Sequence, residues 1–220
     1  LQHLDPPAGS KTVEQLQEIA KSAGVPFILK GIMTVSGAEK AVEAGAAGIV
    51  VSNHGGRVLD DCPATAEVLA DIVAAVDGRA KILVDGGIRT GNDVFKALAL
   101  GAPYISAVGL CRSSMAAAMS AKKIGDLIEA GKVPPELARF GTTKEELFSD
   151  LPELRGLYGS AADGFSTGAV GVYSYLNRIA YGLRHFAALN RKFDVKHIGR
   201  RDVFPLTRDA KELLDGTWLR

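Results

Sequence analysis

The sequence predicts an α/β protein in which four parallel strands alternate with covering helices, as in half of a (β/α)8 barrel. Short apolar segments of strand length alternate with segments of helical periodicity up to Val108, and the connections are short. Candidate polar residues fall at or just after the carboxyl ends of the strands, where such barrels build their active sites. The same four units are compatible with a small open sheet, but this spacing of functional groups favours the barrel.

The first two strands and their helices are identified from apolar periodicity and from the residues that bound each segment. Thr12 is a predicted N-cap, and Gly45 ends the second helix. Pro26 is acceptable at the first position of a strand. The predicted elements are helix Val13–Ala23, strand Phe27–Lys30, helix Val35–Ala44 and strand Gly48–Val51.

The third and fourth strands and their helices follow the same pattern. Thr65 is the predicted N-cap of the third helix, and Gly101 ends the fourth. The predicted elements are helix Thr65–Val76, strand Lys81–Val84, helix Asn92–Leu100 and strand Tyr104–Val108.

After Cys111 the sequence predicts a helical C-terminal extension. The predicted parts are a long helix Ser113–Ala130, short helices within Gly131–Gly164, a long helix Ala169–Asn190 and a tail Leu213–Arg220. Two domains are therefore expected, with residues 1–112 as a half barrel and residues 113–220 as an extension packing on it. Gln2–Ser10 is a polar lead-in after Leu1, and we expect the chain to start partway through a longer polypeptide.

The composition is that of a soluble globular protein with one substantial core. Hydrophobic residues make up 47% of 220 residues, and 26 Lys and Arg against 25 Asp and Glu leave a formal charge of +1. This balance gives no reason to expect nucleic acid or an anionic membrane as a partner, and no apolar run approaches a membrane span. Cys62 and Cys111 are too few for a disulfide framework or a zinc site. We expect reduced cysteines, no metal and a cytoplasmic location.

Ser52–Arg57 is the segment with the clearest chemistry. It follows the apolar strand Gly48–Val51 and places His54 and Arg57 three positions apart in a glycine-rich turn. A histidine exchanges protons near neutral pH, and an arginine holds a carboxylate through two hydrogen bonds. Together they suit a small hydroxy acid.

A second segment, Val84–Gly91, predicts a phosphate site. Asp85 ends a strand, Gly86 and Gly87 let backbone N–H groups approach an anion, and Arg89 can pair with it near a helix start. Asp85 can accept hydrogen bonds from sugar-like hydroxyls. If Tyr104–Val108 is the last strand of a barrel, the other half of the site comes from Gly109 and Arg112.

Lys30 is predicted alone at the end of the first strand, where it would point into the mouth of a barrel. Near a flavin, a lysine in this place could stabilise negative charge on the reduced ring. Each of these residues also has a purely structural interpretation: a lysine reaching water, a hydrogen-bonded loop histidine, a common Asp-Gly turn, a surface arginine at Arg112. Cys62 lacks an activating neighbour in the sequence and is not a predicted nucleophile. Because these residues follow successive strands of one sheet, their combination favours a functional site over the separate structural interpretations.

These segments resemble the FMN-dependent α-hydroxy acid oxidase and dehydrogenase family, which includes glycolate oxidase, lactate oxidase and flavocytochrome b2. The resemblance covers roughly Phe27 to Gly109. It is carried by Ile28–Gly31, Ala44–Arg57, Pro63–Thr65, Val84–Arg89 and Gly91–Ala102.

The resemblance implies a (β/α)8 barrel of the FMN-dependent type, of which this chain supplies about the last four βα units. It implies oxidation of a lactate- or glycolate-like 2-hydroxy acid, with His54 as base and Arg57 holding the carboxylate. Lys30 would contact the flavin N1/O2 edge, Asp85 the ribityl chain, and Gly87 with Arg89 the phosphate. The implied cofactor-binding set is Lys30, Ser52, Asp85, Gly86, Gly87, Arg89, Gly109 and Arg112.

Three departures from the family keep alternatives open. Gly109-Leu110-Cys111-Arg112 stands where the family has Gly-Arg, the ending is similar to glutamate-synthase-like FMN domains, and the family's first four strands are absent. A glutamate-synthase-like FMN enzyme and a non-catalytic half barrel that binds a phosphorylated ligand or another subunit are the alternatives. Because a half barrel leaves open sheet edges, we expect another polypeptide segment to complete it and the protein to be oligomeric.

Overall fold

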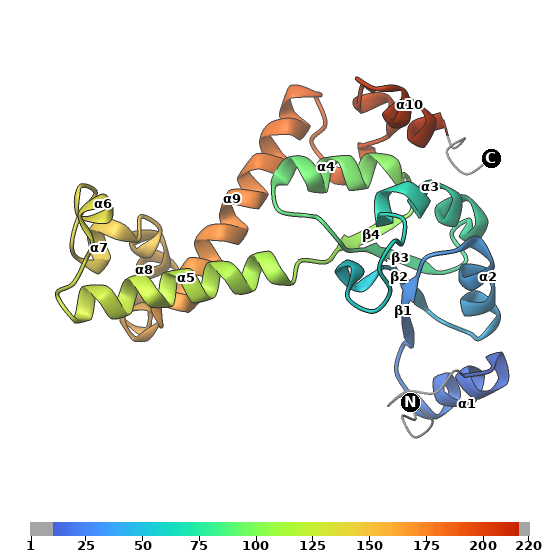
Figure 1. The fold of residues 1–220 in the computed structure, drawn as a ribbon, viewed down its shortest axis with the longest axis horizontal. Helices are drawn as coiled ribbons and strands as arrows, with labels where there is room; N and C mark the ends of the chain where they lie inside the picture. The colour runs from blue at the N-terminus through green and yellow to red at the C-terminus, as the bar shows by residue number, and fades with distance from the viewer. Residues whose placement is uncertain (1–10, 216–220) are drawn as a thin grey trace. The chain divides into compact units, whose positions relative to one another are not determined.

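The computed structural model describes residues 11–215 and contains a four-stranded parallel sheet with the order β1-β2-β3-β4 (Figure 1). The predictions for Gln2–Ser10 and for residues 216–220 lie outside these residues. The strands are β1 Ile28–Ile32, β2 Gly48–Val51, β3 Lys81–Val84 and β4 Ile105–Val108. The helices between and before them are α1 Val13–Ala23, α2 Val35–Glu43, α3 Thr65–Val76 and α4 Gly91–Leu100. The predicted alternation is confirmed, with bounds shifted by at most a few residues.

The two faces of the sheet differ in burial. Ile49 and Ile82 are in register and fully buried, in a core cluster that includes Ala38, Leu69 and Ile72 from α2 and α3. The next row along the strands shares the opposite face, because successive side chains alternate. That row is Lys30, Val50, Leu83 and Ala107, and each of them keeps exposed surface. The helices therefore cover one face and leave the other accessible, as the inner face of a partial barrel would be.

The edge strands are also less buried than the central ones. β1 and β4 contain no fully buried residue, whereas Ile49 and Val51 of β2 and Ile82 and Val84 of β3 are buried. An edge strand presents unpaired backbone groups to whatever lies beside it. The described sheet thus has two open edges, at β1 and at β4.

Local sequence signals explain where the helices begin. The Thr12 side chain accepts a hydrogen bond from Gln15 N–H, which confirms the predicted N-cap of α1. The expectation that Thr65 caps α3 is wrong. Ala64 is the N-cap, and its N–H donates to Glu67 Oε2 at 2.6 Å, which frees the Thr65 hydroxyl for another partner.

The chain after β4 is helical, as predicted. Its elements are α5 Arg112–Glu129, α6 Pro135–Ala138, α7 Lys144–Leu147, α8 Leu151–Tyr158, α9 Thr167–Leu189 and α10 Arg208–Asp215, with short 3-10 turns between them. Gly171 and Gly125 allow α5 and α9 to approach closely, since a Cβ on either glycine would lie 2.2 Å from an atom of the other helix. The predicted tail is wrong for residues 213–215, which are the last turn of α10.

Contacts divide the described chain into two compact units. The first contains residues 11–88, 93–109 and 190–215, and the second contains residues 89–92 and 110–189. Residues 190–215 thus group with the sheet, and Arg200 ties them there by donating to the carbonyl oxygens of Leu100 and Leu214. The predicted domain division at residue 112 stays a prediction. Within residues 11–215, none of the helices has the length and apolar character that crossing a bilayer requires.

Candidate functional site

Lys30 lies inside β1, not at its end as the sequence suggested. It pairs with Val50 of β2, and the register shifts between Lys30 and Ile32 around a bulge at Gly31. Gly31 has a φ of 94°, a backbone conformation that residues with a side chain rarely adopt. The bulge extends the strand beyond Lys30, whose side chain stands on the accessible face of the sheet.

Lys30 joins three strands through its ammonium group. Its Nζ donates to Ser52 Oγ at 2.6 Å and lies 2.5 Å from Asp85 Oδ2. Ser52 follows β2 and is only 1% exposed, and Asp85 follows β3. Because the carboxyl ends of parallel strands lie at the same edge of the sheet, Lys30 meets Ser52, which is 22 positions further along the chain, and Asp85, which is 55 positions further. Lys30, Ser52 and Asp85, three members of the expected cofactor-binding set, thus lie together, and their role in binding FMN stays a prediction.

The turn after β2 holds His54 beside the same serine. His54 N–H donates to Ser52 Oγ at 3.2 Å, and Gly55 N–H donates to Asn53 Oδ1 at 2.9 Å. His54 has a φ of 53°, followed by 67° at Gly55 and 71° at Gly56. A histidine in the left-handed region is uncommon and marks a constrained position. The two glycines follow because this run of positive φ angles suits few other residues.

Asp85, Gly86 and Gly87 form the loop after β3. Gly86 and Gly87 have φ angles of 94° and 75°, and a Cβ on Gly87 would meet open space. The hydroxyl of Thr65 donates to Asp85 O at 2.7 Å, which fixes the start of the loop against α3. Gly109 N–H donates to Val84 O at 2.8 Å, and a Cβ there would lie 2.9 Å from Asp85 Cβ. Glycine at position 109 thus permits the close packing of these two strand ends.

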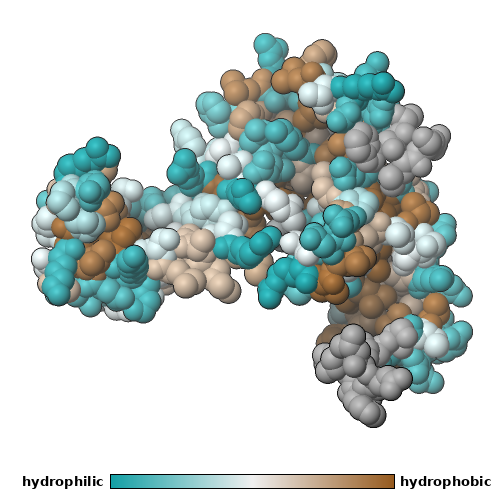
Figure 2. All heavy atoms as spheres, viewed as in Figure 1, coloured by the Kyte–Doolittle hydropathy of each residue, from teal (hydrophilic) through white to brown (hydrophobic). Residues whose placement is uncertain are grey.

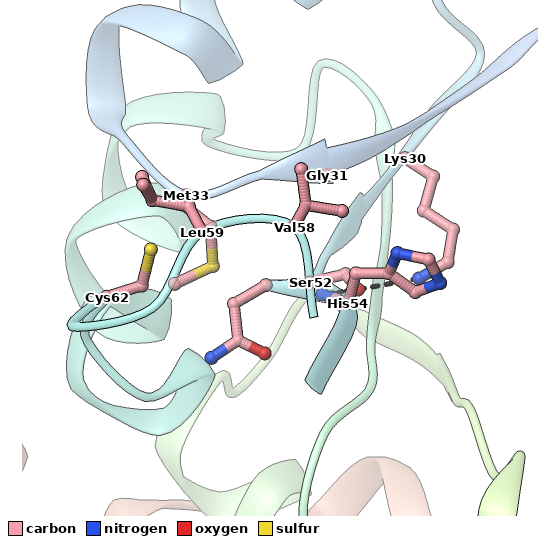
Figure 3. A pocket seen from close by; sticks show the side chains of 9 residues that line it. Lys30, Gly31, Met33, Ser52, His54, Val58, Leu59 and Cys62 are labelled. Atoms are coloured by element: carbon pink, nitrogen blue, oxygen red, sulfur yellow. Dashed lines mark hydrogen bonds between the residues drawn. The ribbon is translucent and has the colours of Figure 1, made fainter. Parts of the chain in front are cut away.

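A cavity of about 490 Å³ opens beside this cluster (Figure 3). Its polar lining includes Lys30, Ser52 and His54, and its apolar lining includes Met33 and Leu59. The complete lining is Lys30, Gly31, Met33, Ser52, Asn53, His54, Val58, Leu59 and Cys62. Figure 3 shows the ammonium of Lys30 meeting Ser52 near the His54 ring, with the sulfur atoms of Met33 and Cys62 toward the other end.

Not all of the predicted site residues lie at the described cavity. Arg57 ends the His54 turn with an ordinary helical φ of −81° and is exposed, and the described cavity lining does not include it. Arg89 and Arg112 belong to the second unit, so their part in a phosphate site stays a prediction. No group of three or more potential ligand side chains for a metal occurs within residues 11–215.

Sequence reasoning missed the residues that hold the loops. Asn53 accepts from Gly55 and donates through Nδ2 to Pro63 O at 3.2 Å, so it fixes both ends of the loop after β2. Asparagine before a glycine-rich turn is a known signal for such side-chain to backbone bonds. Thr65 gave no comparable signal, because its hydrogen bond to Asp85 O joins the start of α3 to the loop after β3.

Comparison with known proteins identifies relatives of the sheet-bearing part of the chain. The sequence profile of FMN-dependent dehydrogenases matches residues 4–126. A peroxisomal (S)-2-hydroxy-acid oxidase of Oryza sativa subsp. indica is 56% identical over 99 residues, which are 45% of this chain and 26% of that protein. An L-lactate oxidase of Lactobacillus jensenii is 52% identical over 88 residues, 40% of this chain and 22% of that protein. The chain thus spans about a quarter of the length of these relatives.

Solved structures match a larger part of the chain. A mandelate oxidase with 3,3-difluoro-2-hydroxy-3-phenylpropionic acid superposes with a TM-score of 0.59 at 34% identity, over 87% of this chain and 43% of that one. A lactate oxidase of Pediococcus acidilactici gives a TM-score of 0.57 at 29% identity, over 89% and 39%. These neighbours and the parallel sheet identify the fold as part of a (β/α)8 barrel.

Proposed function

The chain belongs to the FMN-dependent dehydrogenase family, and on that basis we propose that it oxidises a small 2-hydroxy acid to the 2-oxo acid. FMN is the cofactor of this family. The observation that carries the proposal is that the Lys30 ammonium and the His54 backbone N–H both donate to Ser52 Oγ, and that these three residues line the same cavity. Relatives named as oxidases of 2-hydroxy acids and L-lactate support the choice of substrate class.

His54 and Arg57 have different roles toward the substrate. An imidazole nitrogen of His54 accepts the proton of the 2-hydroxyl group, while Arg57 holds the carboxylate through paired hydrogen bonds. Both side chains are exposed and leave the same short turn, so a small acid can reach both. When bound, FMN would supply the acceptor for the two electrons and the hydrogen that leave C2, while the hydroxyl proton stays on His54.

Lys30, Ser52 and Asp85 fit the polar part of a flavin. An ammonium group suits an edge that gains negative charge on reduction, and Asp85 and Ser52 hold that ammonium in place. Gly86 and Gly87 suit a phosphate, because their positive φ angles and absent side chains leave backbone N–H groups approachable. Arg89, Gly109 and Arg112 complete the proposed cofactor set.

We also propose that a further polypeptide segment covers the accessible face of the sheet and completes the barrel. The proposal is supported by the row of Lys30, Val50 and Leu83, which is exposed at Lys30 and half-buried at the other two residues, and by the weakly buried edge strands β1 and β4. Size-exclusion chromatography with mass measurement tests this point. A well-folded monomer of 23.1 kDa that binds FMN without any partner would contradict it.

A visible spectrum tests the main proposal. Protein mixed with FMN and freed of excess flavin should be yellow, and 2-hydroxy acids should bleach it without oxygen. Yellow protein that no 2-hydroxy acid bleaches would favour a different FMN barrel enzyme. Colourless protein would favour a non-catalytic half barrel.

A further inference from the structure

The helix α9 contacts the segment that carries Arg89, a residue of the proposed phosphate site. The hydroxyl of Tyr175 donates to the carbonyl oxygen of Arg89 at 2.8 Å, across 86 positions of the chain. Residues 89–92 and 110–189 belong to the same compact unit, so this contact lies within one part of the structure. The segment just before α4 is therefore tied to a helix that is far away in the sequence.

Gly91 lets the backbone of α9 come close to the same segment. A Cβ on Gly91 would lie 2.5 Å from Ile179 O, and it would also clash with Leu183 N. On the other side of this contact, a Cβ on Gly182 would lie 3.5 Å from Gly91 Cα, which is an ordinary van der Waals distance. The segment is thus held at two points, by the hydrogen bond from Tyr175 and by backbone packing.

α9 is itself fixed along α5, the helix that begins at Arg112. A Cβ on Gly168 of α9 would lie 3.1 Å from Ala118 O of α5, so the two backbones are close. Figure 2 shows pale and light-brown atoms over the first half of α5, which is rich in serine and alanine, and such small side chains permit this packing. One pair of helices thus carries Arg112 and also holds the backbone of Arg89.

These contacts come from a part of the chain that the family profile does not cover. The profile of FMN-dependent dehydrogenases ends at residue 126, whereas α9 spans Thr167–Leu189. Packing alone would be served by a phenylalanine at position 175, but the tyrosine hydroxyl adds a directed bond to a backbone group. This bond restrains the backbone of Arg89, so the helical extension after Cys111 acts on a residue of the proposed phosphate site.

We propose that Tyr175 is a positioning residue for the cofactor phosphate, and that the helical extension strengthens FMN binding through it. The inference rests on the proposed function, since it takes FMN as the ligand of Gly87 and Arg89. Only Ile88 lies between these two residues, so a bond that fixes the Arg89 carbonyl also limits the conformations open to the loop. A loop that is ordered before the phosphate arrives loses less entropy when it binds the phosphate.

The affinities for FMN and riboflavin test this role, because riboflavin has the same ring and ribityl chain but no phosphate. Tyr175→Phe should raise the Kd of FMN about three- to tenfold, as the loss of one hydrogen bond would, and leave the Kd of riboflavin unchanged. Quenching of flavin fluorescence measures both constants. Tyr181→Phe is the matched control, since Tyr181 lies on the same helix and is 72% exposed.

A double-mutant cycle shows whether Tyr175 acts through Arg89. Arg89→Met removes the guanidinium group and should by itself raise the Kd of FMN. Adding Tyr175→Phe to Arg89→Met should then have a smaller effect than Tyr175→Phe has in the wild type, because residues that act on one ligand group together are not additive. Thermal unfolding of the four proteins without flavin shows whether each variant is folded.

The outcomes separate this inference from the proposed function. Tyr175→Phe that binds FMN as tightly as wild type, or that loses affinity for FMN and riboflavin equally, would overturn the inference and leave the proposed oxidation standing. Full additivity of the two substitutions would overturn it as well. The expected loss of FMN affinity in a protein that no 2-hydroxy acid bleaches would overturn the proposed oxidation alone. A wild-type protein that binds neither flavin would overturn both.

Discussion

Lys30 and Asp85 form an ion pair between the first and third strands of the sheet, with Nζ 2.5 Å from Oδ2. The lysine side chain is 51% exposed and the aspartate 23%, so water screens the pair and its contribution to stability is small, at most about 1 kcal/mol. A lysine held on the accessible face of the sheet for little gain in stability supports the proposed contact with the flavin.

Lys30→Met should weaken FMN binding by about tenfold or more, because it removes a charge-assisted contact of the flavin. The melting temperature should change little, for the reason given above. Fluorescence quenching of FMN measures the affinity, and thermal unfolding measures the stability. Lys81→Met is the matched control, since Lys81 starts β3 at the opposite end of the sheet. Unchanged FMN affinity in Lys30→Met would remove Lys30 from the cofactor site.

Arg57→Lys should raise KM by about tenfold or more with a smaller effect on kcat, because lysine cannot form the paired contact with a carboxylate. Steady-state kinetics with L-lactate measures both constants. Arg79→Lys should behave as wild type, because Arg79 contacts the carbonyl oxygens of Ala75 and Val76 at the far end of α3. Equal KM values in wild type and Arg57→Lys would argue against the carboxylate role.

Gly171→Ala should destabilise the second unit by about 1–3 kcal/mol, because the new Cβ would lie 2.2 Å from Ala121 Cβ on the neighbouring helix. Chemical denaturation measures the change. Gly156→Ala in α8 is the control, since a Cβ there meets nothing within 4 Å and alanine favours a helix. If both variants were equally stable, α5 and α9 would not pack as closely as described.

Asp77 raises the pKa of Tyr104 above its ordinary value of 10.0, chiefly by accepting a hydrogen bond from the phenol at 3.0 Å and also through its negative charge. Because the folded pKa is the higher one, the stabilisation is fully present below the unfolded pKa and is lost as pH rises through the folded pKa. Asp77→Asn should lower the pKa of Tyr104, and asparagine tolerates the φ of 44° at this position. Ultraviolet absorbance of phenolate against pH measures the shift. An identical titration in both proteins would contradict the account.

Much of the sheet was predictable from local patterns. Gly48–Val51 and Lys81–Val84 were predicted with the bounds found, because buried parallel strands appear as short apolar runs. Thr65 was assigned wrongly, because Ala64 is the N-cap and its N–H donates to Glu67 Oε2, while the Thr65 hydroxyl donates to Asp85 O, 20 residues away. The bulge at Gly31 depends on how β1 pairs with β2, and no local pattern specifies that pairing.

Part of the candidate site was also predictable from the sequence. Lys30, Ser52 and Asp85 meet because parallel strands share one carboxyl edge, which the alternation of strands and helices implies. The apolar lining of the cavity at Met33 and Leu59 and the hydrogen bond from Arg200 to Leu100 O depend on contacts between distant segments. Hydrophobic periodicity carries no information about such contacts.

The most direct test of the central claim is the anaerobic reaction of FMN-loaded protein with L-lactate, followed at the flavin absorbance in wild type and His54→Ala. Wild type should bleach, and His54→Ala should keep its flavin but bleach about a hundredfold or more slowly, because the base is gone. His185→Ala on α9 serves as the control and should bleach normally. Bleaching of His54→Ala at the wild-type rate would contradict the assignment of His54 as the base.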